Sequence, residues 1–223
     1  MASPKKIGVV LSGCGVMDGA EIHESVITLL AIDRAGARAV CMAPNIDQAG
    51  VINHLTGKEE ARERRNVLVE SARIARGKIQ DIKDVRAADL DAVILPGGYG
   101  AAKNLCDFAV KGENCHVQPE VTRLLRDMLK AQKPIGVVCI APALMGKVAQ
   151  EAGKAITLTI GNDPGTAAAL KKMGVTHVEK PVTEIVVDRQ HKIVSTPAYM
   201  LAQRISEAAT GIEKLVKTVI EMA

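Results

Sequence analysis

A cysteine stands where a buried strand is predicted to turn into a helix. Ile135, Val137 and Val138 form a short apolar run of β-branched residues, which is typical of a buried strand. Cys139 follows directly, and Pro142 stands where the first turn of a helix tolerates a missing N–H group. Such a turn exposes a side chain at the end of a sheet and directs helix N-terminal amides toward it, which favours a thiolate. We interpret Cys139 as a candidate nucleophile; the alternative is a small cysteine buried in the core.

Acidic side chains lie near the start of a helix predicted after the first strand. Glu21, Glu24 and Thr28 are three and four positions apart, so they share one face of that helix, and His23 lies between the glutamates. A carboxyl group beside a thiol needs a raised pKa to keep its proton, and burial at a strand end could supply it. Both glutamates and His23 are therefore candidate site residues. The alternative is that the glutamates are ordinary helix-start carboxylates that match the helix dipole.

Paired glycines follow the strand predicted at 91–95. Without a Cβ atom, Gly97 and Gly98 let the backbone amides approach a substrate oxygen, as an oxyanion site requires; the alternative is a tight turn. Ligands of parallel sheets bind beyond the carboxyl ends of the strands. We therefore expect the glycines, Cys139 and the glutamates to meet at one end of the sheet.

Other motifs give weaker predictions. Gly13-Cys14-Gly15 is not a dinucleotide fingerprint, because the third glycine comes too late and no ribose-binding acid follows strand two. Cys115-His116 has no second pair at metal-ligand spacing, so we interpret it as a loop pair. His177-Val178-Glu179 has the His-x-Glu form of an amidotransferase base pair, but it falls within a predicted strand soon after Cys139. We predict neither a cofactor nor a metal.

Apolar runs and helical periodicities alternate along the whole chain. The predicted strands cover residues 7–11, 38–43, 91–95, 135–138 and 156–160, and a hairpin is predicted from 184–187 and 192–195. The predicted helices cover residues 20–35, 66–75, 117–131, the stretch from Cys139 to about 150, 165–173 and 200–221. No linker or repeat divides the chain, so we predict one α/β domain over residues 1–223 with a mostly parallel sheet.

Composition excludes several classes of protein. The 223 residues carry a net charge of +4 with interspersed acids, and three aromatic residues are too few for base stacking on nucleic acid. No apolar run reaches a membrane-spanning length. Five cysteines without a CxxC pair indicate a reducing compartment. Because the first strand is expected to start near Lys6, leaving no room for a presequence, we predict a cytoplasmic protein.

Several sequence blocks, in order, resemble the ElbB family, also called the isoprenoid-biosynthesis or sigma cross-reacting protein family. They are Ser-Gly-Cys-Gly-Val-Met-Asp-Gly-Ala-Glu-Ile-His-Glu (12–24), Ile-Asn-His-Leu-Thr-Gly (52–57), Arg-Asn-Val-Leu-Val-Glu-Ser-Ala-Arg-Ile-Ala-Arg-Gly (65–77), Pro-Gly-Gly-Tyr-Gly-Ala-Ala-Lys-Asn-Leu (96–105), Cys-Ile-Ala-Pro-Ala (139–143) and Thr-Pro-Ala-Tyr-Met (196–200). Together they cover nearly the whole chain.

That family is similar to the PfpI and Parkinson-associated deglycase superfamily, and to class I glutamine amidotransferases. The resemblance implies a flavodoxin-like three-layer sandwich, a homodimer and a nucleophile-elbow cysteine that matches Cys139. It also implies that the second glutamate of Gly-Ala-Glu-x-x-Glu matches Glu24 and that the paired glycines match Gly97 and Gly98. Ile140 departs from the pattern, since many relatives have histidine directly after the cysteine, and this puts a Cys-His-acid triad in doubt.

The resemblance implies glyoxalase chemistry on a small 2-oxoaldehyde, without added cofactor. The Cys139 thiolate would attack the aldehyde, Glu24 would carry the proton, and the amides of Gly98 and Ile140 would hold the oxyanion. The loop after Gly15 and the 44–60 segment are expected to cover the site. The alternative functions are a redox-sensing regulatory protein with an oxidisable Cys139, and amidotransferase-like hydrolysis with a partner synthase.

Overall fold

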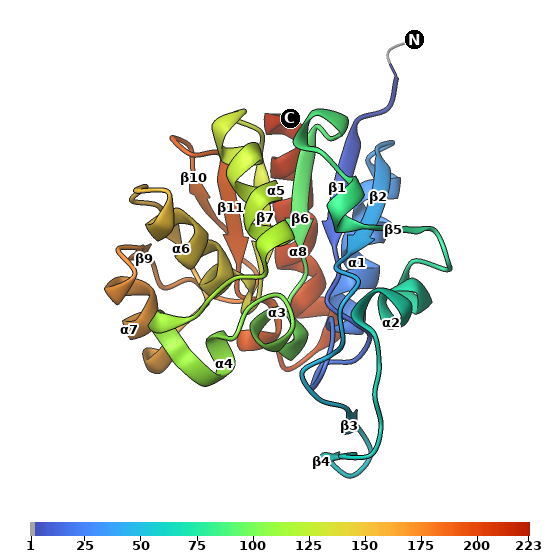
Figure 1. Ribbon diagram of the computed structural model, residues 1–223. Coiled ribbons are helices and arrows are strands. Elements are labelled where there is room, and N and C mark those ends of the chain that lie inside the picture. Colours follow the sequence, from blue (N-terminus) through green and yellow to red (C-terminus); the bar gives the residue numbers. More distant parts are fainter. Residues whose placement is uncertain (1–2) are drawn as a thin grey trace.

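Seven strands form one sheet in this computed structural model, which describes residues 3–223 (Figure 1). In spatial order they are β10 (Val186–Asp188), β11 (Ile193–Thr196), β7 (Ile135–Val138), β6 (Ala92–Leu95), β1 (Lys6–Val10), β2 (Arg38–Ala43) and β5 (Ile79–Asp81). Neighbouring strands are parallel except β10 and β11, which are antiparallel. The predicted mostly parallel sheet and the predicted hairpin are confirmed.

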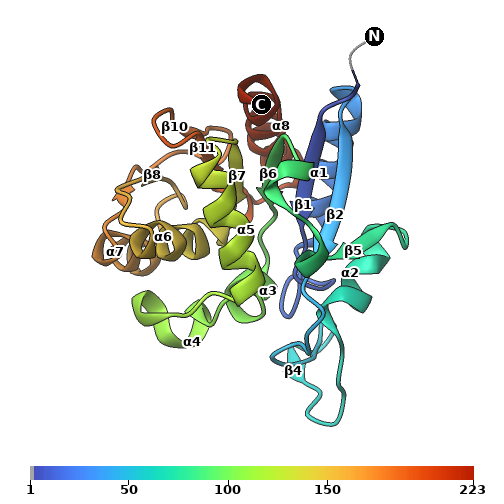
Figure 2. The same ribbon diagram turned by 45° about the horizontal axis from the view of Figure 1, so that its top comes forward.

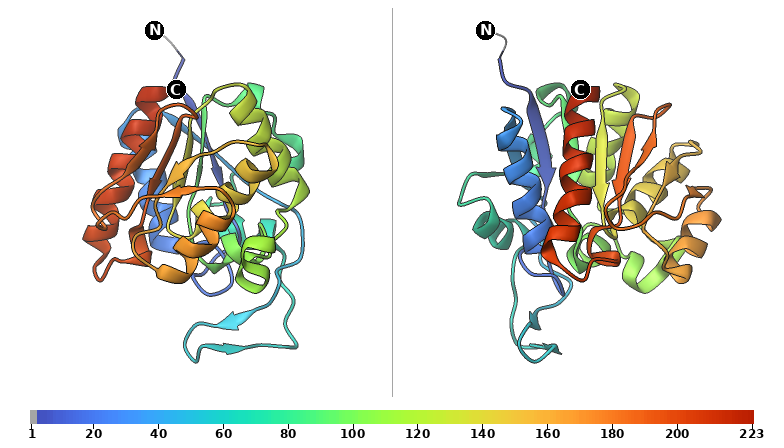
Figure 3. Two further views of the ribbon diagram at one scale, coloured as in Figure 1. Left: turned by 90° about the vertical axis from the view of Figure 1, so that its left-hand side faces the viewer. Right: turned by 180° about the vertical axis from the view of Figure 1, so that it is seen from behind.

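Helices cover both faces of this sheet. The longer ones are α1 (Ile22–Arg34), α2 (Val67–Ile74), α5 (Pro119–Lys130), α6 (Ala141–Glu151), α7 (Pro164–Lys172) and α8 (Ile205–Met222). From behind, α1 and α8 lie side by side across one face, while α5 and α6 cover the other (Figure 3). Each face has its own apolar core: Ile32 and Leu215 belong to one, Leu125 and Leu144 to the other. The chain therefore forms the expected three-layer sandwich.

Two local predictions are wrong. Strand β5 was missed because Ile79-Gln80-Asp81 has a single apolar residue and forms an edge. The run 156–160 gives only β8 (Thr157–Leu158), which pairs with β9 (Thr176–His177) outside the main sheet.

The last helix begins five residues later than predicted. Residues Ala198–Met200 form a separate short 3₁₀ turn, and Arg204 is extended. The Glu207 carboxyl accepts hydrogen bonds from the backbone N–H groups of Gln203 and Arg204, at 2.9 and 3.2 Å, and these contacts set the true start of α8. The apolar periodicity extends to Leu201, so it could not locate this break.

The chain order changes direction between β1 and β6, which are neighbours. From β1 the chain proceeds outward to β2 and β5, and it then returns to the other side of β1 to build β6 and β7. Ligand sites of doubly wound sheets lie at such a switch point, beyond the carboxyl ends of the strands. In Figure 1 this end of the sheet is the lower one, where α3 (Tyr99–Lys103) and α4 (Phe108–Lys111) also lie.

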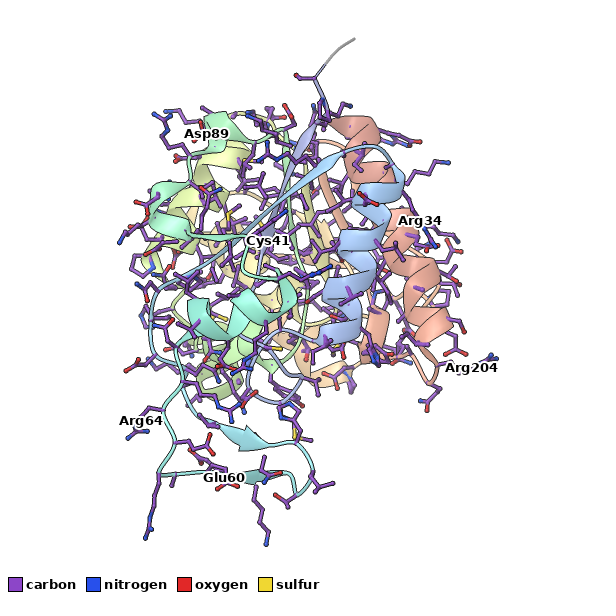
Figure 4. All side chains as sticks on the ribbon, turned by 90° about the vertical axis from the view of Figure 1, so that its right-hand side faces the viewer. Arg34, Cys41, Glu60, Arg64, Asp89 and Arg204 are labelled. Carbon is purple, nitrogen blue, oxygen red and sulfur yellow. The ribbon has the colours of Figure 1, made fainter. Side chains whose placement is uncertain are left out.

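The hairpin of β3 (Ile52–Asn53) and β4 (Lys58–Glu59) projects below the same end. Figure 4 shows Glu60 and Arg64 on this projecting segment, away from the body that contains Cys41. Within the described part of the chain, no helix has the length and apolar character needed to cross a membrane.

Candidate active site

Cys139 occupies a strained turn between β7 and α6. Its φ angle is +60°, in a region that non-glycine residues rarely adopt. Its backbone N–H donates a 3.0 Å hydrogen bond to Thr196 O on the neighbouring strand, which holds the turn in place. The residue is buried, with 8% of its surface exposed, and it borders a pocket. Strain of this kind persists where the surrounding structure enforces it, commonly at functional sites. The predicted sharp turn from strand to helix at Cys139 is confirmed, and the function of Cys139 as a nucleophile stays a prediction.

Glu24 lies against this cysteine and is fully buried. The Gly97 N–H donates a 2.8 Å hydrogen bond to its Oε2, and the Tyr199 N–H donates a 3.2 Å hydrogen bond to its Oε1. The carboxyl group lies beside the Cys139 thiol, since both groups border Gly97, and each group changes the pKa of the other. Residues that follow three neighbouring strands therefore meet at this site. Glu24 follows β1, Gly97 follows β6 and Cys139 follows β7.

Burial controls the ionisation of this pair. Burial raises the pKa of Glu24 to about 7, although the amide hydrogen bonds from Tyr199 and Gly97 lower it. Burial, followed by the charge of Glu24, raises the pKa of the Cys139 thiol well above its ordinary value. The sequence predicted that helix amides would favour a thiolate. The amides of Gly98 and Ile140 do lower the pKa of Cys139, but burial and the charge of Glu24 raise it by more. The two groups act as one unit, in which the carboxylate can take the proton of the thiol.

The two glycines have different functions. The amide of Gly97 is bonded to Glu24, so it positions the carboxyl group rather than an oxyanion. A Cβ atom on Gly97 would lie 2.4 Å from Cys139 Cβ and 2.7 Å from Glu24 Oε2, which explains the need for glycine. The amides of Gly98 and Ile140 instead lie close enough to the Cys139 thiol to lower its pKa. These two amides converge on the sulfur, where a substrate oxygen could also be held.

Glu21 and His23 border the site. Glu21 caps α1, since its Oε2 accepts a 2.6 Å hydrogen bond from the Glu24 N–H. His23 Nδ1 lies 2.9 Å from the Tyr199 hydroxyl, and more than half of its side chain is exposed. The sequence therefore identified two neighbours of the reactive pair, of which His23 lies outside the pocket lining.

A pocket opens beside the thiol. It is lined by Val16, Glu21, Gly98, Tyr99, Ala102, Phe108, Ala109, Cys139, Ile140, Asp163, Thr166, Tyr199 and Met200. Phe108 and Ala109 come from α4, and Thr166 comes from the first turn of α7; Figure 2 shows these two helices next to each other. Tyr199 stood within the block Thr-Pro-Ala-Tyr-Met, so the sequence held a signal for it. Nothing in the sequence pattern indicated Phe108 or Asp163.

The 44–60 segment does not line this pocket, contrary to expectation. Its His54 instead accepts a 3.1 Å hydrogen bond from the Met17 N–H and lies 3.8 Å from Asp18 Oδ1. Both partners belong to the loop after β1, whose Val16 does line the pocket. The segment therefore supports the covering loop from outside.

The weaker motifs stay apart from the site. His177 Nε2 accepts a 3.4 Å hydrogen bond from the Ile160 N–H and is not part of the pocket lining, so it is not the base of a Cys-His pair. The Cys115 thiol is buried, and the nearby Cys106 thiol donates a 3.3 Å hydrogen bond to Ala101 O. No cluster of three or more metal-binding side chains occurs among residues 3–223.

Comparisons with known proteins agree with this geometry. A model of the DJ-1/PfpI family matches residues 14–202. The rat protein named "ES1 protein homolog, mitochondrial" is 46% identical over 97% of this chain and 84% of its own length. The human "Glutamine amidotransferase-like class 1 domain-containing protein 3, mitochondrial" is 45% identical over 97% of this chain and 83% of its own length.

Solved structures confirm the flavodoxin-like sandwich. An isoprenoid biosynthesis protein with an amidotransferase-like domain from Ehrlichia chaffeensis has a TM-score of 0.91 and 36% identity, and the match covers 98% of this chain and 99% of that one. Drosophila melanogaster DJ-1beta, with a TM-score of 0.55 and 20% identity over 99% and 96% of the two chains, shares the fold alone.

The predicted cytoplasmic location is wrong by these comparisons. The rat and human relatives, and a zebrafish relative that is 36% identical over 87% of this chain and 76% of its own length, are named mitochondrial. The prediction rested on cysteine usage and on the position of the first strand. Neither feature distinguishes two reducing compartments.

Proposed function

Because this chain belongs to the DJ-1/PfpI family, we propose that it is a cofactor-independent glyoxalase that converts glyoxal to glycolate. The family includes glyoxalase and deglycase enzymes and amidotransferase-like proteins. The observation that supports the proposal is the buried Cys139–Glu24 pair, in which the nucleophile lies beside the proton carrier and each group changes the pKa of the other. Methylglyoxal would react in the same way.

The first step forms a carbon–sulfur bond. Glu24, as the carboxylate, takes the thiol proton while the sulfur attacks one aldehyde carbon of glyoxal. The negative charge that develops on the aldehyde oxygen meets the amides of Gly98 and Ile140, and the oxygen then receives the proton to complete a hemithioacetal. A carboxyl group with a pKa near 7 suits both directions of this transfer.

The second step is an internal oxidation and reduction. Glu24 removes the hydrogen of the sulfur-bearing carbon as a proton, and the aldehyde oxygen of the neighbouring carbon is protonated, which gives an enediol. A proton then returns to the neighbouring carbon while the hydroxyl group on the sulfur-bearing carbon loses its proton and becomes a carbonyl. The first carbon becomes a thioester and is oxidised by two electrons, and the second becomes an alcohol and is reduced by two. Water then cleaves the thioester, releasing glycolate and the free thiol. No external oxidant or reductant is consumed, so no redox cofactor is required.

Within the family, we place the chain in the ElbB-like group. The identity of 36% with the Ehrlichia isoprenoid biosynthesis protein over nearly the full length of both chains supports this placement. A single domain over residues 1–223 and a homodimer remain predictions of the same resemblance. Gel filtration with light scattering tests the dimer.

The decisive experiment compares the wild-type protein with the Cys139→Ala variant. Glyoxal loss and glycolate formation are followed together without glutathione, and circular dichroism checks that both proteins are folded. We expect glycolate in proportion to glyoxal consumed for the wild type and a rate at least 100-fold lower for the variant, a loss typical of removing a catalytic group. Equal rates in both proteins would exclude the mechanism.

A redox-sensing protein with an oxidisable Cys139 is the second candidate. Its support is the position of Cys139 in the wall of a pocket, beside a carboxyl group that could form a hydrogen bond to an oxidised sulfur. The raised pKa of Cys139 opposes it, because the thiolate is the form that peroxide oxidises. Absence of turnover, together with a peroxide-driven gain of two oxygen atoms confined to Cys139, would favour the sensor.

A further inference from the structure

The pocket beside Cys139 is larger than glyoxal requires. Its volume is about 360 Å³, within the range of roughly 300 to 1,000 Å³ that is typical of sites for drug-sized ligands. A water molecule occupies about 30 Å³ of liquid, so the pocket has room for many more atoms than the four heavy atoms of glyoxal. This differs from the small site expected from the covering loops.

One part of the pocket is apolar. The side chains that form it are Val16, Ala102, Phe108, Ala109, Ile140 and Met200. They come from the loop after β1, from α3 and α4, and from the turns after β7 and β11. An apolar or aromatic group attached to the aldehyde would bury its surface here, and the removal of that apolar surface from water favours binding.

The charged side chains of the lining are both acidic. They are Glu21 and Asp163, and no lysine, arginine or histidine of residues 3–223 lines the pocket. Hydrogen bonds from Thr166 hold the pKa of Asp163 below its ordinary value, so it is an anion at neutral pH. Lys103 is near, but its Nζ lies 3.4 Å from Met17 O and 5.2 Å from the centre of the Tyr99 ring.

We propose that this site selects uncharged 2-oxoaldehydes that carry an apolar group of up to aromatic size, and that Glu21 and Asp163 discriminate against anionic substrates. The inference rests on the proposed glyoxalase function and deepens it. A partly enclosed site strengthens the repulsion between like charges relative to open water. The same repulsion assists release of the product, since every 2-oxoaldehyde yields the anion of a 2-hydroxy acid.

A pair of substrates of similar shape tests the selection. Phenylglyoxal and 4-carboxyphenylglyoxal differ by one negative charge, and the rate with Cys139→Ala is subtracted for each. We expect kcat/KM of the wild-type protein to be at least tenfold higher for the uncharged compound, and KM for phenylglyoxal to be lower than for glyoxal. The measured quantity is the ratio of kcat/KM between the two aryl compounds. A variant that loses activity toward both compounds to the same degree leaves this ratio unchanged.

Asp163→Asn is the informative variant, because asparagine keeps the helix cap of α7 while removing the charge. We expect the ratio to fall at least threefold. Glu221→Gln removes one charge near the end of α8, far from the pocket, and serves as the matched control that leaves the ratio unchanged. A wild-type ratio near one, or a ratio that Asp163→Asn does not alter, overturns the selection even when Cys139-dependent turnover is found.

A binding measurement separates this proposal from the reaction. If no 2-oxoaldehyde is turned over, the glyoxalase function fails, and protection of Cys139 from iodoacetamide tests the pocket alone. Acetophenone should protect at a concentration at least tenfold lower than 4-carboxyacetophenone does. Equal protection by both compounds, or none by either, contradicts the selection.

Discussion

The backbone amide of Gly97 donates a 2.8 Å hydrogen bond to Oε2 of Glu24, and this contact fixes the carboxyl group against Cys139. The glycine is in contact with both reactive residues, since a Cβ atom there would overlap with Cys139 Cβ as well as with Oε2. The carboxyl group therefore cannot turn away from the sulfur without losing the Gly97 amide.

Replacing Glu24 by glutamine should abolish most of the activity. Glutamine has nearly the same shape, but it cannot carry the proton. Its NH₂ group accepts no hydrogen bond, so the N–H of either Gly97 or Tyr199 loses its acceptor. We expect kcat for glyoxal to fall by about 10² to 10⁴-fold, the usual value of general acid–base catalysis. Glu70→Gln is the matched control, because Glu70 is also a buried glutamate but pairs with Arg73 on α2. Similar losses in both variants would contradict the assignment.

The contribution of Glu24 to the stability of the protein should fall as the pH rises from 4.5 to about 7. Glu24 has a pKa of about 7 in the folded chain, raised by burial from 4.5. Between these values the folded state binds more protons than the unfolded state, so the free energy of unfolding decreases with pH. The contribution is fully present below 4.5 and lost above about 7. A shift from 4.5 to 7 corresponds to about 3 kcal/mol at 1.36 kcal/mol per pKa unit.

Urea unfolding of the wild-type protein and Glu24→Gln at several pH values between 4 and 8 measures this contribution. The wild-type protein should lose about 3 kcal/mol more than the variant over that range, because glutamine does not titrate. Parallel curves would show that the carboxyl group does not change its pKa on folding.

Gly98→Ala should be far more damaging than Gly36→Ala. Both glycines have positive φ angles, +91° and +70°, so alanine is strained at each position, by about 1 to 2 kcal/mol. Only at Gly98 would the new Cβ also meet backbone, 2.4 Å from Glu21 N and 2.5 Å from Gly19 O, whereas nothing lies within 4 Å at Gly36. Thermal unfolding should show a larger decrease in melting temperature for Gly98→Ala than for Gly36→Ala. The substitution should also displace the Gly98 amide, which lowers the activity of the protein that remains folded. Equal melting temperatures would count against this arrangement.

Much of the framework could be predicted from the sequence because its central strands are continuous apolar runs. Strand β2 was placed at its observed bounds, and β1, β6 and β7 were each placed within about one residue. The edge strand β5 (Ile79–Asp81) was not predicted, because an edge strand needs no apolar run.

The site was predicted in part, for a related reason. Residues that follow a strand meet at the end of the sheet, so Cys139, Glu24 and Gly98 could be brought together by topology. Tyr199 contributes a backbone amide that any residue type could supply, and Asp163 reaches the pocket from α7, outside the main sheet. The ionisation of Cys139 was misjudged because it depends on burial beside a second acid, which the sequence does not reveal.

The reactivity of Cys139 toward alkylation should rise when Glu24 is replaced by glutamine, although turnover falls. The charge of Glu24 is the second cause, after burial, of the raised pKa of the thiol. Removing that charge lowers the pKa, so more thiolate is present at pH 8, and the thiolate is the form that iodoacetamide attacks. The rate of Cys139 labelling, measured by mass spectrometry of its peptide to separate it from the other four cysteines, should increase several-fold. Glu70→Gln should leave this rate unchanged. Slower labelling in Glu24→Gln would mean that the carboxyl group activates the thiol in the free protein, and the proton would then have to rest on Glu24 before substrate arrives.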